Sequence, residues 1–259
     1  PYQYVSIRYE ITQRKEAEER LLDYAKKLEV SNRELQDFAS IAAHDLQEPL
    51  RKVRAFADRV ATKYKSLIPV EALEYLSRIN VSAERMQRLI DDLLMYSRIV
   101  TKAQPFKEVD LGEIARGVLD DLEFSIEQSQ GRIDVSELPQ IEADPVQMRQ
   151  LMQNLFANAL KFHQQGVPPV VRVSSQEGTK TVRIEVSDNG IGFSEKYLDR
   201  IFTIFQRLHG RMEYEGTGVG LAVCRRIVER HGGTITAKSS EGQGATFIVE
   251  LPKKQDKKE

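Results

Sequence analysis

Residues 154–162 read Asn154-Leu155-Phe156-Ala157-Asn158-Ala159-Leu160-Lys161-Phe162. The stretch follows Asp144-Pro145, which suits a helix start, and its periodicity predicts a helix over residues 145–163. Asn154, Asn158 and Lys161 share one helix face, at spacings of four and three residues. An ordinary amphipathic helix would also place such residues on its solvent side. The functional alternative is an amide oxygen on a metal ion with an ammonium group beside it, both facing a polyphosphate.

Three glycine clusters follow this helix. One ends a strand, one opens a helix and one reads as a hairpin turn: Asp188-Asn189-Gly190-Ile191-Gly192, Gly216-Thr217-Gly218-Val219-Gly220 and Gly242-Gln243-Gly244-Ala245-Thr246. N–H groups at a helix start attract anions, but the second cluster lacks the Lys-Ser/Thr of a P-loop and the spacing of a dinucleotide fingerprint. Each cluster alone is weak evidence, whereas their order behind the Asn-bearing helix is informative.

The patterns around these motifs mix helices and strands. They predict helices at residues 111–128, 145–163 and 218–231, with strands at 132–135, 170–175 and 181–187 and two more up to residue 251. Such a mixture indicates an α/β sandwich, in which helices pack on a single sheet.

A heptad repeat precedes this region. Steps of four and three between Glu18 and Val60 meet mostly apolar residues, which predicts a long helix that begins as a coiled coil, with Asn32 as a buried seam residue. Residues 64–69 break the pattern, and a second helix then presents one apolar face: Leu73, Leu76, Ile79, Ala83, Met86, Ile90, Leu93 and Leu94. A hairpin with an exposed apolar stripe must pair, so we expect a homodimeric four-helix bundle. Residues 1–9 alternate like a strand, as at the exit of a preceding domain.

His44 lies at a heptad position that points away from the seam. An ordinary surface histidine is the simplest interpretation of that position. Asp45 beside it can hold one ring nitrogen and raise the basicity of the other, as a general base requires. Pro49 removes a backbone hydrogen bond one turn later and predicts a bend there.

Composition excludes several classes of protein. The 259 residues include 38 Lys+Arg and 39 Asp+Glu, a net charge of -1, so neither nucleic acid nor an anionic membrane is an expected partner. The single cysteine, Cys224, excludes an internal disulfide and fits a reducing, cytoplasmic compartment. No apolar run reaches the roughly 18 residues of a membrane segment.

Taken together, the motifs resemble the sensor histidine kinases of two-component systems over about residues 34–251. His44-Asp45-Leu46 with Pro49-Leu50 resembles the phosphoacceptor box, most closely that of the phytochrome-type branch, and residues 154–162 resemble the Asn box. The three glycine clusters and Phe202-Thr203-Ile204-Phe205-Gln206-Arg207 resemble the remaining glycine and Phe boxes. Residues 1–15 resemble the exit of a PAS sensor domain.

The resemblance implies a multi-domain chain: an N-terminal coiled coil and antiparallel helical hairpin, forming a dimeric four-helix bundle, followed by an α/β sandwich ATP-binding domain of the gyrase/histidine-kinase type. Its expected parts are the end of a PAS-like domain (1–15), a coiled-coil linker (16–36), a dimerisation and phosphotransfer domain (37–103), a catalytic ATP-binding domain (104–253) and a frayed polar tail (254–259).

The resemblance also implies the site residues. Asp188 would accept the adenine amino group, Phe162 would pack near the base, and Thr246 would support Asp188 at the pocket wall. Asn158 would ligate Mg²⁺ with Asn154 alongside, and Lys161 and Arg207 would contact the phosphates of ATP. The implied glycine positions are Gly190 and Gly192 in the first box and Gly216, Gly218 and Gly220 at the phosphate tail. Residues 193–215 would form a mobile lid, in which His209 is more simply a solvated residue than a nucleotide contact.

The implied activity is ATP-dependent phosphorylation of His44, followed by transfer to an aspartate of a response regulator receiver domain. Two other classes stay open: ATPases of the gyrase, heat-shock-chaperone and mismatch-repair type, and a non-catalytic scaffold. The family's phosphatase motif carries Thr or Asn where this chain has Glu48, so we expect weak phosphatase activity. Whether His44 is phosphorylated within one chain or across the dimer depends on the handedness of the turn at residues 64–69, which the sequence does not specify.

Overall fold

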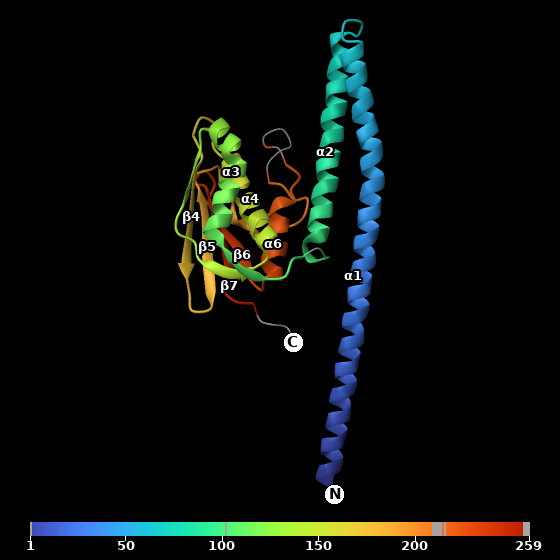
Figure 1. Cartoon of the computed structure of the whole chain (residues 1–259), viewed down its shortest axis with the longest axis vertical. Helices are drawn as coiled ribbons and strands as arrows, with labels where there is room; N and C mark the ends of the chain where they lie inside the picture. The colour runs from blue at the N-terminus through green and yellow to red at the C-terminus, as the bar shows by residue number, and fades with distance from the viewer. Residues whose placement is uncertain (1, 102, 209–213, 215, 256–259) are drawn as a thin grey trace.

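The computed structural model describes residues 2–101, 103–208, 214 and 216–255. Apart from several positions between residues 14 and 34, the described side chains begin at Ile41. A long helical hairpin of α1 (Tyr2–Lys63) and α2 (Val70–Thr101) lies beside an α/β domain (Figure 1). The turn between the helices falls at residues 64–69 as predicted, and the combination of hairpin and α/β domain confirms the predicted fold class.

Small buried side chains let α1 and α2 pack closely. Ala43, Ala57 and Ala83 are only 3%, 6% and 1% exposed. Two polar pairs cross the seam: the Gln47 amide donates to Asp91 (2.6 Å) and the Asn80 amide donates to Asp58 (2.5 Å). Both pairs define the same antiparallel register, which places His44 opposite Leu94.

The predicted seam residues of α1 lie on a different face from these contacts. Leu46, Val53, Phe56 and Val60 are exposed, as are Ile79, Met86 and Leu93 on α2. The heptad therefore describes an apolar stripe that the hairpin leaves uncovered, as the sequence suggested. The side chain of Asn32 lies outside the described residues.

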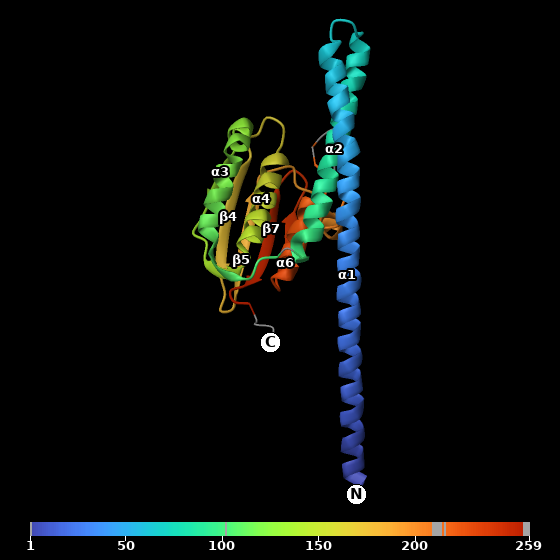
Figure 2. The ribbon, with the colours of Figure 1, turned by 45° about the vertical axis from the view of Figure 1, so that its right-hand side comes forward.

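Residues 2–9 are helical, so the prediction of a strand there is wrong. Among the described residues no strand lies beside this segment, and a lone strand would leave its backbone N–H and C=O groups unpaired, whereas a helix pairs them internally. Helix α1 also runs through Pro49 as an unbroken ribbon, so the missing hydrogen bond does not end it (Figure 2). Of the described helices, none is long and apolar enough to cross a membrane.

The α/β domain centres on a five-stranded sheet with the order β2-β4-β5-β7-β6. Its strands are β2 (Arg132–Val135), β4 (Val170–Glu177), β5 (Thr181–Asp188), β6 (Thr234–Ser239) and β7 (Ala245–Pro252). β2 pairs with β4 in parallel, and every other neighbouring pair is antiparallel.

Helices α3 (Leu111–Ser129), α4 (Pro145–Lys161) and α6 (Gly220–Arg230) cover one face of this sheet (Figures 1 and 2). Their inner residues share one core with alternate residues of the strands, including Leu111, Phe156, Ile227, Val171 and Leu251. These elements match the predicted ones. The sequence did not predict the two-stranded sheet of β1 (Lys107–Asp110) and β3 (Gln140–Ala143), nor η1 (Glu195–Tyr197) and α5 (Leu198–Ile201).

The start of the polar tail is held rather than frayed. The Gln255 backbone N–H donates to the Glu142 carboxylate (2.9 Å), and its side-chain amide donates to the His231 carbonyl (3.2 Å). The rest of the tail, residues 256–259, lies outside the described residues.

Candidate functional site

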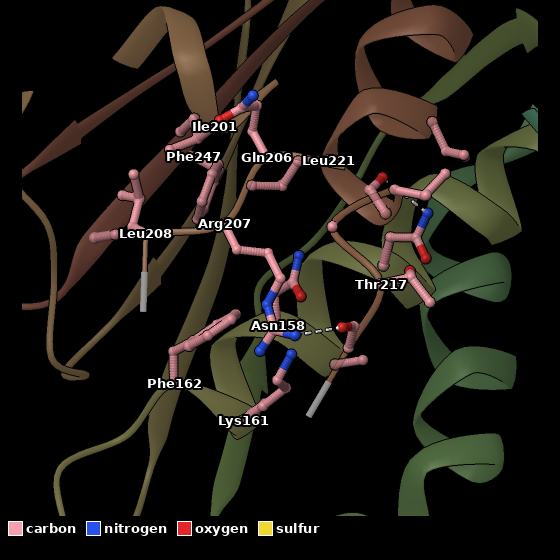
Figure 3. A pocket seen from close by; sticks show the side chains of 18 of the residues that line it. Asn158, Lys161, Phe162, Ile201, Gln206, Arg207, Leu208, Thr217, Leu221 and Phe247 are labelled. Carbon is pink, nitrogen blue, oxygen red and sulfur yellow. Dashed lines mark hydrogen bonds between the residues drawn. The ribbon is translucent and has the colours of Figure 1, made fainter. Parts of the chain in front are cut away.

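A cavity of about 500 Å³ opens between α4, the end of β5, the loop before α6 and the last turns of α2. Most of the residues predicted as a nucleotide site line it: Asn154, Asn158, Lys161, Phe162, Asp188, Gly192, Arg207, Gly216, Gly218 and Gly220. Figure 3 shows Asn158 and Lys161 rising from α4, with Arg207 reaching toward them from another wall. The fold thus gathers residues more than 60 positions apart around one space.

Helix α4 presents its polar face to the cavity because its other face is buried in the core. Asp144 caps the helix, accepting from the backbone N–H groups of Val146 (3.0 Å) and Gln147 (3.2 Å). The Asn154 amide donates to the Gly220 carbonyl (3.2 Å), which ties α4 to the start of α6. The Asn158 side chain has no hydrogen-bond partner among the described residues, so its amide oxygen is available to a ligand.

Asp188 lies at the end of β5, where two backbone N–H groups fix its carboxylate. Those of Gly190 (2.9 Å) and Ala245 (3.1 Å) donate to Oδ1. Burial raises the pKa of Asp188, and the two N–H groups partly oppose that rise. The second oxygen therefore remains a preoriented acceptor, suited to an amino group of a ligand.

Glycine is required where the backbone segments beside Asp188 touch. A Cβ on Gly190 would lie 2.2 Å from the Phe162 carbonyl oxygen, and one on Gly192 would lie 2.1 Å from that of Ser240. Gly192 also has φ +60°, in the left-handed region that favours glycine. Close backbone contact, rather than contact with a ligand, thus explains these two glycines.

The loop before α6 shapes the opposite end of the cavity. Gly216 and Gly218 have positive φ (+141° and +79°), which bends the chain into the helix start at Gly220. The Arg207 guanidinium donates to the carbonyls of Gly216 (2.8 Å) and Tyr214, so it braces this loop. The helix start and the two side-chain cations, Arg207 and Lys161, favour an anion here.

Phe162 lines the cavity. Its ring lies 5.1 Å from that of Tyr214, centroid to centroid, and the Lys161 ammonium lies 4.3 Å from the Phe162 ring. Of the expected lid, residues 193–208 and 214 are described; His209 lies outside the described residues.

Thr246 does not reach the cavity. It pairs with Ser187 across β5 and β7, and the two hydroxyl groups lie 2.9 Å apart. Because side chains alternate along a strand, Thr246 faces away from the wall to which Ala245 and Phe247 belong. Asp188 is supported by the Ala245 N–H instead, so this expectation was off by one residue.

His44 lies on the open surface of α1, with its side chain 78% exposed. Its Nδ1 is 3.2 Å from the Asp45 carboxylate, the arrangement that the sequence predicted. One turn later Glu48 pairs with Lys52 (2.6 Å), and that hydrogen bond is the main cause of a lowered pKa at Glu48. Leu46 beside His44 is also exposed, so a partner can approach this surface.

Sequence reasoning missed two kinds of residue. Asp92 and Met95 of α2 line the cavity although they belong to the hairpin. His231 is fully buried: its Nδ1–H donates to the Ile227 carbonyl (2.7 Å), and its Nε2 accepts from the Asp144 backbone N–H (3.1 Å). Burial lowers the pKa of His231, which keeps it neutral. The pattern His231-Gly232-Gly233 predicted that His231 lies at a helix end, but it did not predict that its side chain is buried.

Comparisons with known proteins identify both parts of the chain. Residues 34–102 match the His Kinase A (phospho-acceptor) domain, and residues 143–255 match the histidine kinase-, DNA gyrase B- and HSP90-like ATPases. The chain belongs to the sensor histidine kinases.

Curated histidine kinase relatives are longer than this chain, which spans about a third of them. Phytochrome-like protein Cph1 of Synechocystis is 38% identical over 234 residues, 90% of this chain and 31% of that protein. Sensor histidine kinase WalK of Bacillus subtilis is 29% identical over 242 residues, 89% of this chain and 39% of that protein.

Solved histidine kinases share the architecture. Full-length ShkA in complex with AMPPNP has a TM-score of 0.63 at 26% identity, covering 83% of this chain and 45% of that one. Histidine kinase ThkA in complex with the response regulator TrrA has a TM-score of 0.59 at 25% identity, covering 86% and 63%. The hairpin and the α/β domain thus correspond to the phosphoacceptor and ATPase domains of this family.

Proposed function

We propose that this chain is the kinase core of a homodimeric sensor, which transfers the γ-phosphoryl group of Mg-ATP to His44. One observation carries the proposal: the cavity combines a preoriented, half-buried carboxylate, Asp188, with a cationic, N–H-rich end at Lys161, Arg207 and the loop before α6. The amino group of a base matches the carboxylate end of the cavity, and a polyphosphate matches the cationic end.

ATP would bind with its adenine amino group donating to Asp188 and its base against Phe162. The phosphates would then face the loop of Gly216, Gly218 and Gly220, with the Lys161 and Arg207 cations alongside. The backbone contacts at Gly190 and Gly192 hold the adenine end rigid, which reduces the entropy lost on binding.

The residues also fit Mg²⁺, which prefers oxygen ligands and retains several waters. Asn158 would hold the ion through its amide oxygen, because the Asn154 oxygen already accepts from the Gln150 amide (3.2 Å) while its nitrogen donates to Gly220. When bound, the ion would neutralise charge on the transferring phosphoryl group.

At His44 the chain itself supplies the nucleophile. Asp45 would accept the Nδ1–H and so hold the tautomer in which Nε2 carries a lone pair. Nε2 would attack the γ-phosphorus in line, forming an N–P bond while the bond to the bridging oxygen breaks and ADP leaves. The positive charge that develops on the ring would be stabilised by Asp45.

A second copy would cover the apolar stripe of the hairpin. Leu46, Val53 and Phe56 on α1, with Met86 and Leu93 on α2, repeat at heptad spacing and are 37–63% exposed. Uncovered stripes of this kind are typical of subunits in four-helix bundles. We keep the expected parts of the chain: the end of a PAS-like domain (1–15), a coiled-coil linker (16–36), a dimerisation and phosphotransfer domain (37–103), a catalytic ATP-binding domain (104–253) and a polar tail (254–259). We also propose that a sensor domain lies upstream and that the protein is cytoplasmic, where ATP is available.

The phosphoryl group would pass from His44 to an aspartate of a response regulator receiver domain, since ThkA forms a complex with a response regulator. We expect weak phosphatase activity, because Glu48 would place a carboxylate where a water must be directed at an anionic phosphoryl group. If this chain with nucleotide speeds dephosphorylation of its regulator manyfold, that part of the proposal is wrong.

The test is incubation with ATP labelled in the γ or the α position. We expect acid-labile, alkali-stable protein label from γ-labelled ATP only, and none in His44→Gln. Label that persists in His44→Gln would overturn the assignment of the acceptor. Nucleotide binding without any label would favour a non-catalytic scaffold.

A further inference from the structure

Among the described residues, two groups of polar contacts join the α/β domain to the hairpin, in addition to the packing of α2 on α6 and of Tyr96 and Ile99 on the core. The first, here called the joint, surrounds the end of α2: the Gln147 amide donates to the Ile99 carbonyl (2.6 Å), and the Gln104 backbone N–H donates to Asp144 (2.7 Å). Arg230 adds bonds to Asp144 (3.2 Å) and to the Gln104 carbonyl (2.9 Å). Asp144 is 1% exposed and the Gln147–Ile99 hydrogen bond is buried, so the centre of this polar network is strongly held, although Gln104 lies at the surface.

The second polar contact is a hydrogen bond at the rim of the cavity, beside the packing of α2 on α6. The Thr217 hydroxyl, in the loop before α6, donates to the carboxylate of Asp92 on α2. Both residues line the cavity, as does Met95 one turn later on α2. Figure 3 shows Thr217 on the strip of loop that faces the helix of the hairpin. One half-exposed hydrogen bond is much easier to break than the joint.

The Thr217–Asp92 contact lies at the same position along the hairpin as His44. It is made to α2, however, whereas His44, the proposed acceptor of the phosphoryl group, is on α1. The hairpin register puts His44 opposite Leu94, between Asp92 and Met95 along α2. α2 rather than α1 faces the α/β domain in both views (Figures 1 and 2). In the docked arrangement the cavity is therefore closed against α2, while His44 is exposed on α1.

Charge makes the contact sensitive to what fills the cavity. Asp92 places a carboxylate beside the loop whose N–H groups, with Lys161 and Arg207, favour an anion. A polyphosphate bound there and the Asp92 carboxylate would repel each other at short range. The two equilibria are linked, so the effect is reciprocal. If bound nucleotide weakens the Thr217–Asp92 contact, then the contact weakens nucleotide binding by the same factor.

We propose that the Thr217–Asp92 hydrogen bond is a latch, which docks the empty α/β domain on α2 and is released by a nucleotide triphosphate, so that the domain can turn about the joint toward a histidine. The proposal rests on the proposed function, because it requires that the cavity binds ATP. It adds an inhibitory role for a phosphoacceptor-domain residue, Asp92, that opposes nucleotide binding.

The neighbouring Asp91 provides a matched control. It is also a carboxylate of α2, but it accepts from Gln47 of α1 and so belongs to the hairpin seam. Asp91→Asn removes the same charge one residue away without touching the latch. Asp92→Asn removes the charge and keeps a hydrogen-bond acceptor. Asp92→Ala removes both the charge and the acceptor, and alanine is well tolerated in a helix.

The first measurement is titration of each chain with a fluorescent ATP analogue. We expect Asp92→Ala and Asp92→Asn to bind about two- to fivefold more tightly than wild type, as for removal of one partly exposed charge, and Asp91→Asn to match wild type. We also expect faster initial phosphorylation of Asp92→Ala. Equal affinities for Asp92→Ala and Asp91→Asn would overturn the latch.

The second measurement needs no nucleotide, so it separates failure of the latch from failure of the proposed function. Spin labels at Ser66→Cys, in the exposed hairpin turn, and Glu127→Cys, on the exposed side of α3, report the separation of the two parts. Cys224 will not compete, because burial raises the pKa of its thiol to about 12. We expect a longer, broader distance distribution in Asp92→Ala than in Asp91→Asn. Identical distributions would contradict the latch, whereas absence of ATP binding by wild type would contradict the proposed function.

Discussion

The nucleotide cavity and the surface around His44 are built in opposite ways. The cavity is enclosed by backbone segments so close that one methyl group on Gly190 or Gly192 would collide with a carbonyl oxygen. His44 is 78% exposed and is in contact with one carboxylate. The fold thus preorganises the cavity for a small molecule, whereas His44 depends on a phosphoryl donor being brought to its exposed surface. The comparison predicts large effects for changes near the cavity and the joint, and small ones on the surface of α1.

Gly190→Val should have the largest effect on nucleotide binding. A Cβ there would lie 2.2 Å from the Phe162 carbonyl oxygen, so the Asp188 loop must shift. We expect ATP to bind about ten- to hundredfold more weakly, because overpacking costs about 1–3 kcal/mol. Gly166→Ala is the control: it is a positive-φ glycine with open space around it, so it strains the backbone without invading the cavity. Equal losses of affinity would show that steric fit at Gly190 is not the cause.

Arg230→Met should have the largest effect on folding stability, because it leaves the buried Asp144 carboxylate without its cation. We expect a loss of about 2–4 kcal/mol in the free energy of unfolding, measured in urea. Arg149→Met removes a similar ion pair, with Asp121, that is more than 40% exposed on both sides, and should cost about 1 kcal/mol or less. Comparable losses in the two variants would contradict the buried joint.

His231→Gln should alter how stability depends on pH. Burial lowers the pKa of His231 in the folded chain, so below pH 6.5 the unfolded chain binds a proton that the folded chain does not. Wild-type stability should therefore fall on acidification through this range, by at most about 1.4 kcal/mol per pH unit from this group. His231→Gln should lose that component, and the exposed control His44→Gln should keep it. Parallel pH profiles for His231→Gln and wild type would exclude this explanation.

Glu48→Gln should have the smallest effect. The hydrogen bond to Lys52 lowers the pKa of Glu48, so its stabilising contribution is present at neutral pH and lost on acidification below its ordinary value of 4.5. Both side chains are at least half exposed, and water and salt screen the pair. We expect no measurable change in Tm at neutral pH, in low or high salt. A fall as large as that of Arg230→Met would contradict the contrast between the two regions.

Periodicity and motifs were sufficient to predict the hairpin, the strands of the main sheet and ten of the residues that line the cavity. These features depend on local patterns, such as the face shared by Asn154, Asn158 and Lys161. Residues that act through tertiary contact were not predictable: Thr217 meets Asp92 across 125 positions, and His231 meets Asp144 across 87. The strand expected at residues 1–9 failed because alternation over one short segment does not reveal whether a partner strand is present. Thr246 was misplaced because the resemblance does not specify strand phase.

The most direct test of the account measures nucleotide binding and phosphorylation in the same two variants. His44→Gln should bind the ATP analogue like wild type and take no label from γ-labelled ATP, whereas Gly190→Val should lose both. That result would assign binding to the cavity and acceptance to the exposed histidine. Undiminished label in His44→Gln, or full nucleotide binding by Gly190→Val, would contradict the division of roles between the two regions.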